Sequence, residues 1–99
     1  MSWGEPVVIA LLTVRLRAPW VHSLKEKRSE LKSLLAKIRN QFNVSAVELD
    51  EQDIHQTLVL GVAAIAANHQ LADSIMENIQ RFIEQNSDAE VVRVEVEYR

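Results

Sequence analysis

In each half of this chain, the spacing of the apolar residues changes from that of a strand to that of a helix and back to that of a strand. Val7–Arg17 ("VVIALLTVRLR") and Gln56–Ala67 ("QTLVLGVAAIAA") are nearly continuous apolar runs rich in aliphatic and β-branched side chains. Such runs are typical of strands with both faces covered. Each run is followed by a segment with helical spacing and then by a shorter segment with strand spacing. The sequence therefore predicts two successive strand–helix–strand units.

The first helix has a defined start and one apolar side. Ser23 is followed three residues later by Glu26, which is the pattern of a capping box. With Leu24 set at 0° and 100° per residue, six apolar residues fall within an arc from about 280° to about 20°. They are Leu24, Leu31, Leu34, Leu35, Ile38 and Phe42. We expect this stripe to face the core over five turns.

The second half of the chain follows the same scheme. Residues 44–51 are expected to form a short strand, and Asn68 is expected to cap a helix that ends near Gln85. The stripe predicted to be buried in that helix consists of Leu71, Ile75, Ile79 and Phe82. Apolar residues then alternate with charged ones from Val92 to Tyr98, which predicts a closing strand.

The order β-α-β-β-α-β is that of an α+β, ferredoxin-like sandwich. This arrangement has a four-stranded antiparallel sheet of order 4-1-3-2 with two helices on one face. The first and third strands are central in that order, and they are the most apolar strands of the chain. We expect one domain over residues 1–99, with residues 1–6 ("MSWGEP") as a flexible N-terminal extension.

The face of the sheet without helices is predicted to be too apolar for water. The first strand places Val8, Ala10, Leu12, Val14 and Leu16 on one side but still has Val7, Ile9 and Leu11 on the other. The third strand is apolar on both sides as well. Because monomers rarely expose more than a few hundred Å² of contiguous apolar surface, we expect this face to be buried in a homo-oligomer. The alternative is that the tail "MSWGEP" folds over it.

Charge is distributed unevenly along the chain, although the net charge is only −3. Residues 1–50 carry eight Lys and Arg against five Asp and Glu, whereas residues 51–99 carry three against nine. The chain has no cysteine, which excludes disulfides, and no apolar run near the ~20 residues that span a bilayer. We expect a cytoplasmic protein with no membrane segment.

The cations of the first half gather around the start of the first helix. Lys25, Lys27 and Arg28 stand at the helix end that repels positive charge, at a cost of about 0.3–1 kcal/mol each in exposed settings. Because cations at this helix end cost stability, we expect them to serve as a surface that binds phosphates. The predicted contacts are Arg15, Arg17, Lys25, Lys27, Arg28, Lys32 and Arg39. Lys25, Arg28, Lys32 and Arg39 project as one stripe between about 40° and about 100°. The alternative is that basic side chains only shield the flank of the apolar stripe, and Lys27, which lies off the basic stripe, fits that alternative.

Other kinds of site find little support in the sequence. The central strands lack the aromatic residues on which RNA-binding sheets stack bases, and Gly4 and Gly61 form no phosphate loop. Trp20, between Arg17 and Lys25, either offers a stacking surface or closes the end of the core. The acidic segment "ELDEQDIH" (48–55) matches no known ligand loop. We therefore expect no metal, no cofactor and no enzymatic activity.

The segment "SLKEKRSELKSLLAKIRNQFNVSAVE" resembles the signature of the YlxP-like family, small bacterial proteins catalogued as a domain of unknown function. The similarity extends from the first strand to the closing "VEVE". It implies a ferredoxin-like fold. Because members are often encoded among translation and ribosome-maturation genes, it also implies an association with RNA or ribosomes.

Two functional hypotheses remain. In the first, the chain is a non-enzymatic homo-oligomer that binds RNA or a ribosomal partner through its basic first helix. In the second, it is a small-molecule-sensing or assembly module of the ACT-like kind, with its ligand between subunits and no role in nucleic-acid binding.

Overall fold

The computed structural model describes residues 7–49 and 56–99. The elements in chain order are β1 (Val8–Arg17), α1 (Leu24–Gln41), β2 (Ser45–Leu49), β3 (Thr57–Ala66), α2 (His69–Asn86) and β4 (Glu90–Tyr98). The proposed extension, residues 1–6, and positions 50–55 of the acidic segment lie outside the described residues. Within the described ranges, every expected strand and helix is present.

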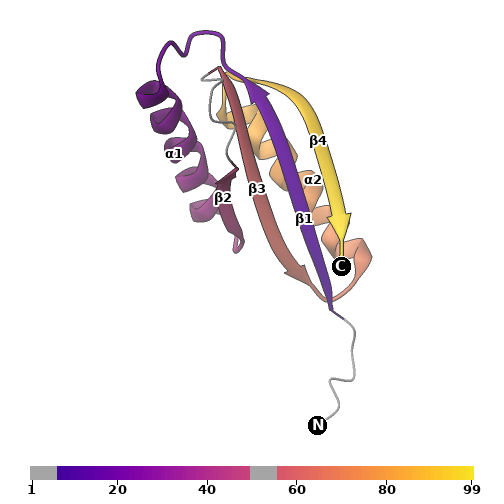
Figure 1. Cartoon of the computed structure of the whole chain (residues 1–99). Helices are drawn as coiled ribbons and strands as arrows, with labels where there is room; N and C mark the ends of the chain where they lie inside the picture. The colour runs from indigo at the N-terminus through magenta and orange to yellow at the C-terminus, as the bar shows by residue number, and fades with distance from the viewer. Residues whose placement is uncertain (1–6, 50–55) are drawn as a thin grey trace.

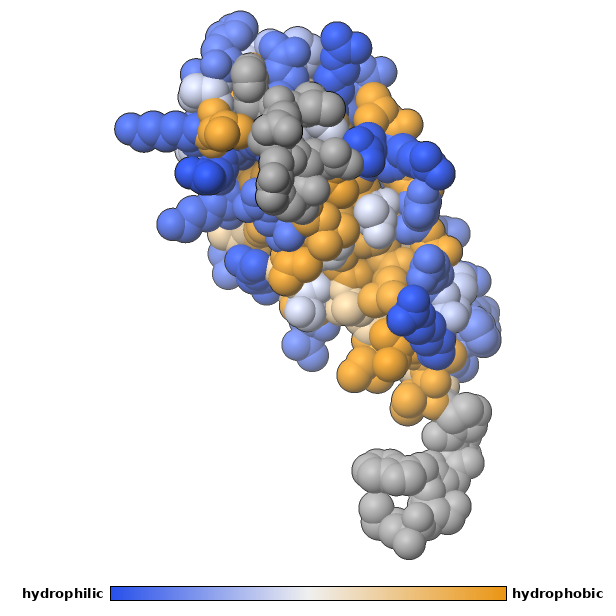
Figure 2. Space-filling view, viewed as in Figure 1, coloured by the Kyte–Doolittle hydropathy of each residue, from blue (hydrophilic) through white to orange (hydrophobic). Residues whose placement is uncertain are grey.

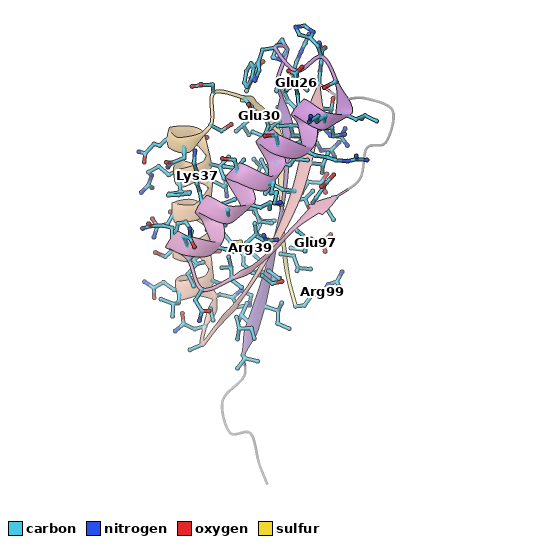
Figure 3. The ribbon with its side chains drawn as sticks, turned by 90° about the vertical axis from the view of Figure 1, so that its left-hand side faces the viewer. Glu26, Glu30, Lys37, Arg39, Glu97 and Arg99 are labelled. Carbon is cyan, nitrogen blue, oxygen red and sulfur yellow. The ribbon has the colours of Figure 1, made fainter. Side chains whose placement is uncertain are left out.

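The four strands form one antiparallel sheet of order β2-β3-β1-β4. This is the predicted order read from the opposite edge, with β1 and β3 in the centre. Figures 1 and 3 show both helices on the same side of the sheet, with α1 near β2 and α2 behind β1 and β4. The α+β ferredoxin-like fold is therefore confirmed.

Both helices begin at the predicted capping residues. The Ser23 hydroxyl oxygen accepts a hydrogen bond from the Glu26 N–H at 3.1 Å. The Asn68 side-chain oxygen accepts one from the Leu71 N–H at 2.8 Å. Each cap satisfies one of the backbone donors that a helix start leaves without an intrahelical partner.

The core lies between the sheet and the helices. Alternate residues of β1, from Val8 to Leu16, are buried against them, as the strand period requires. From α1 the buried side chains include Leu31, Leu34, Leu35 and Ile38, as predicted. Leu24, at the first turn of α1, is exposed, so the buried apolar stripe begins at Leu31, about two turns later than predicted.

The predicted buried face of α2 was correct at Ile79 and wrong by one position at its three other residues. The buried residues are Ala72, Met76, Ile79 and Ile83. Leu71 is 48% exposed, and Ile75 and Phe82 pack only against the margin of the core. Apolar residues occur in adjacent pairs along α2, so two stripes about 100° apart have equal helical spacing. Phe82 instead turns toward α1, where its ring meets Phe42 edge to face at 5.3 Å.

Candidate nucleic-acid interface

Three cations form an exposed stripe on one flank of α1. Lys25, Arg28 and Lys32 are all exposed, and their helical positions fall within about 60° of arc. The carboxylates Glu26 and Glu30 fall on the other flank of the helix. Positive and negative charges on the first half of α1 are therefore separated rather than mixed. We call Lys25, Arg28 and Lys32 the cation stripe.

The cation stripe is locally unfavourable for the free protein. Arg28 and Lys32 are four residues apart and Lys25 and Arg28 three apart, so like charges are neighbours on the helix surface. Each such pair costs about 0.2–0.5 kcal/mol. Within residues 7–49 and 56–99, the ion pairs that the structure shows are Arg93 with Glu95 and Arg99 with Glu97, both far from the stripe. An anion bound from outside would relieve this repulsion.

Two further predicted contacts on α1, Lys27 and Arg39, have structural roles instead. Lys27 is only 3% exposed, because its helical position falls in the arc of the buried residues Leu31 and Leu34. We therefore withdraw Lys27 from the predicted surface. Arg39 donates a hydrogen bond from its guanidinium to the backbone carbonyl of Ala46, which fixes the last turns of α1 to β2. Figure 3 shows Arg39 and Lys37 on opposite flanks of α1.

The structure separates the remaining two predicted residues from the cation stripe. Arg15 and Arg17 belong to the set of β1 residues that alternates with the buried one, so they lie on the helix-free side of the sheet. The helix α1 covers the opposite side. Arg15 is half-buried and lies directly across from Arg93 of β4, whereas Arg17 is exposed at the strand end. The seven predicted contacts therefore do not form one surface.

Trp20 does not extend the cation stripe. Its indole N–H donates to a carboxylate oxygen of Glu30 at 3.4 Å, and the side chain is 40% exposed. Because Glu30 lies on the flank opposite Lys25 and Arg28, this hydrogen bond holds the Trp20 indole at that flank and away from the cation stripe. The Ser23 side chain is also engaged, since its hydroxyl caps α1.

A model of the family described as "Protein of unknown function (DUF503)" matches residues 9–96. This match covers every strand and both helices in almost their full length. The chain belongs to the DUF503 family. The DUF503 chain is 37% identical over 62 residues to the "Uncharacterized protein YlxP" of Bacillus subtilis (strain 168), covering 63% of this chain and 67% of the relative. The resemblance seen in the sequence is thereby confirmed.

Among solved structures, the DUF503 chain is similar to "De novo designed protein Foldit4" with a TM-score of 0.55 and 16% identity, over 95% of this chain and 97% of the designed one. It is also similar to a mutant of SnoaB, a cofactor-independent oxygenase from Streptomyces nogalater, with a TM-score of 0.42 and 14% identity, over 93% and 90% of the two chains. At this identity the similarity to the designed protein shows a shared fold alone. The similarity to SnoaB, with its lower TM-score, supports no conclusion.

A second polar cluster of the DUF503 chain was missed by the sequence analysis. The Tyr98 hydroxyl at the end of β4 donates a hydrogen bond to a carboxylate oxygen of Asp73 on α2. The Tyr98 ring also meets the His69 ring edge to face at 5.2 Å. The hydrogen bond to Asp73 raises the pKa of Tyr98 above its ordinary value. Nothing in the local sequence predicts this contact, because it depends on β4 ending beside the start of α2.

No metal site or membrane-spanning helix was found in the part of the chain that the structure describes. Residues 7–49 and 56–99 contain no group of three or more His, Cys, Asp or Glu side chains placed to hold an ion. No helix in these ranges is both long and apolar enough to cross a bilayer. The acidic segment that the sequence singled out lies mostly at positions 50–55, outside these ranges.

Proposed function

We propose that this protein binds RNA through the cation stripe of α1 and catalyses no reaction. The observation that carries the proposal is the run of three exposed cations, Lys25, Arg28 and Lys32, with their neighbouring carboxylates on the other flank. A free helix gains nothing from this arrangement. A polyanion that follows the flank would gain three charge-assisted contacts at once.

The residues favour contact with the phosphate backbone rather than with bases. β1 and β3, both described in full, contain no aromatic residue on which a base could stack. Arg28 can hold a phosphate with two parallel N–H donors, and the two lysines act as point charges. Such contacts carry little sequence information, so we expect recognition of RNA shape and charge.

The acidic second half of the chain limits how RNA can approach. Residues 51–99 carry nine Asp and Glu against three Lys and Arg, and the chain as a whole has a net charge of −3. Nucleic acid is repelled by surfaces of that sign, so binding would be confined to the basic flank. This charge distribution favours docking at one place over coating of RNA along its length.

The proposal is tested with two pairs of charge reversals. In Lys25→Glu with Lys32→Glu, two cations of the stripe are reversed, and we expect RNA affinity at low salt to fall on the order of tenfold or more. The matched control is Lys37→Glu with Arg81→Glu, which changes the net charge equally at exposed positions elsewhere on the helices. Affinity is measured by fluorescence anisotropy with a labelled ribosomal RNA fragment.

Equal loss of affinity in both pairs would show that only net charge matters and would contradict a defined surface. No measurable RNA binding by the unaltered chain at low salt, together with thermal stabilisation by a small metabolite, would favour the ACT-like alternative. Circular dichroism of all variants checks that each one is folded. Co-purification of RNA with the unaltered chain at low salt, and its loss at high salt, extends the test to cells.

A further inference from the structure

The helix-free face of the sheet carries a contiguous apolar block. Figure 2 shows hydrophobic side chains gathered along the middle of this face, with hydrophilic ones at its margins. The block spans β2, β3 and β1 and consists of Ile9, Leu11, Val47, Leu49, Val59, Gly61, Ala63 and Ile65. Ile65 is 73% exposed, the most of any large apolar side chain in the described residues.

The border of the apolar block on β4 is charged but internally neutralised. Arg93 pairs with Glu95 at 2.8 Å, and Arg99 pairs with Glu97 at 3.2 Å. These four residues share the helix-free side of β4. Glu97 and Arg99 lie beside the apolar residues Leu11 and Ile9 of β1, whereas Arg93 and Glu95 lie beside the polar residues Arg15 and Thr13. An apolar centre with a polar border is the usual anatomy of a protein–protein interface.

The same face carries a hollow and a projection. The hollow has a volume of about 250 Å³, and its floor consists of small residues, with Gly61 across from Val47 and Ala63 across from Ser45. Leu49 leans over Gly61, because a Cβ at position 61 would lie 3.1 Å from its Cδ1 atom. Ile65, four residues along β3 from Gly61, projects from the same face.

We propose that the apolar block is the interface with a second copy of this chain, packed face to face about a two-fold axis. In an isologous interface, each subunit presents the same patch, so a projection on one copy meets a hollow on the other, and the reverse. Ile65 of each subunit would thereby fill the hollow above Gly61 of its partner. A face that carries both the projection and the hollow is suited to a copy of itself.

The available area is near the lower end of what a stable dimer buries. β1 and β3 have ten residues each, β4 has nine and β2 has five, which at about 3.3 Å per residue and about 4.8 Å per strand gives a projected face of roughly 540 Å². The side chains corrugate this face, which brings the accessible surface close to the ~800 Å² per partner of a standard interface. Sheets packed in this way cross at about 30°, with their inner side chains interdigitated. The helices, with the cation stripe, stay on the outside, so this inference is independent of the proposed function.

Sedimentation equilibrium of the full chain over a concentration series tests the inference. The unaltered chain, with a mass of 11.3 kDa, is expected to reach twice that mass. Ile65→Lys places a charge at the projection that would enter the partner's hollow and is expected to raise the dimer dissociation constant about thirtyfold or more. The side chain at position 65 is mostly exposed in the single chain, so the variant should remain folded. The matched control is Leu71→Lys, an exposed apolar residue in the helix layer, which should leave the constant unchanged.

A second variant fills the hollow from within. Gly61→Val suits the strand backbone, and the nearest atom to its new side chain is the flexible end of Leu49. It should weaken the dimer while thermal unfolding stays cooperative. A sedimenting monomer at all concentrations for the unaltered chain overturns the inference. A dimer that survives both Ile65→Lys and Gly61→Val overturns it equally, because the subunits would then meet through another surface.

Discussion

Tyr98 is the only tyrosine of the chain, so its titration can be followed directly. Its hydroxyl is held by the Asp73 carboxylate, and this hydrogen bond is the main cause of its raised pKa. The charges of Asp73 and Glu77 act in the same direction, because a tyrosinate beside carboxylates is repelled. At this scale one side chain joins the end of β4 to α2.

The first prediction concerns this titration. The tyrosinate absorbance of the unaltered chain should appear with a midpoint above 10.0, the ordinary value. In Asp73→Asn the midpoint should move back toward that value, since the charge is removed. Asp88→Asn, at an exposed position outside this contact, is the control and should leave the midpoint in place.

The sign of the effect on stability follows from the raised pKa. A group that titrates higher in the folded state contributes stability below its unfolded pKa and loses it as pH rises through the folded one. The unaltered chain should therefore lose stability above about pH 10 more steeply than Tyr98→Phe, measured by urea unfolding. Parallel pH profiles for the two proteins would contradict a stabilising contact.

At the scale of elements, the start of α1 depends on the side chain of Ser23. The loss of its hydroxyl removes the acceptor for the Glu26 N–H. We expect Ser23→Ala to lower the free energy of unfolding by about 1 kcal/mol. The control is Ser33→Ala, an exposed position inside the helix, which should be neutral or slightly stabilising because alanine is the better helix former. Urea unfolding compares the two, and equal effects would contradict the cap.

The element boundaries and strand order could be predicted because they depend on local signals. The caps at Ser23 and Asn68 and the apolarity of β1 and β3 are visible in the sequence itself. The buried face of α2 could not be fixed by the same means. Paired apolar residues give it two stripes of equal spacing, and only packing against the sheet and against Phe42 selects one.

The candidate site was predicted less well than the fold, for reasons that are also physical. The spacing of Lys25, Arg28 and Lys32 placed them correctly on one flank of α1. Charge type alone could not show that Lys27 is buried or that Arg39 binds the Ala46 carbonyl. Arg15 is near α1 in sequence but lies on the other side of the sheet, since strand alternation decides its side.

At the scale of the whole molecule, the two layers present surfaces of different character. The helix layer carries the cation stripe, and the sheet presents the apolar block on its other side. A dimer formed through the apolar block would display two cation stripes, which strengthens binding to one long polyanion by raising the effective concentration of the second contact. The two proposals are separable, because Ile65→Lys changes the first surface and Lys25→Glu with Lys32→Glu changes the second.

The central claim is that the cation stripe contacts phosphates. The salt dependence of RNA binding tests this claim most directly. Each neutralised phosphate of a single strand contributes about 0.7 to the slope of log affinity against log salt concentration. Three contacts therefore predict that affinity falls with a slope of about −2 per subunit, and that Lys25→Glu with Lys32→Glu makes the slope shallower by about 1.4. The same slope for the unaltered chain and this variant would show that Lys25 and Lys32 touch no phosphate, and it would contradict the account.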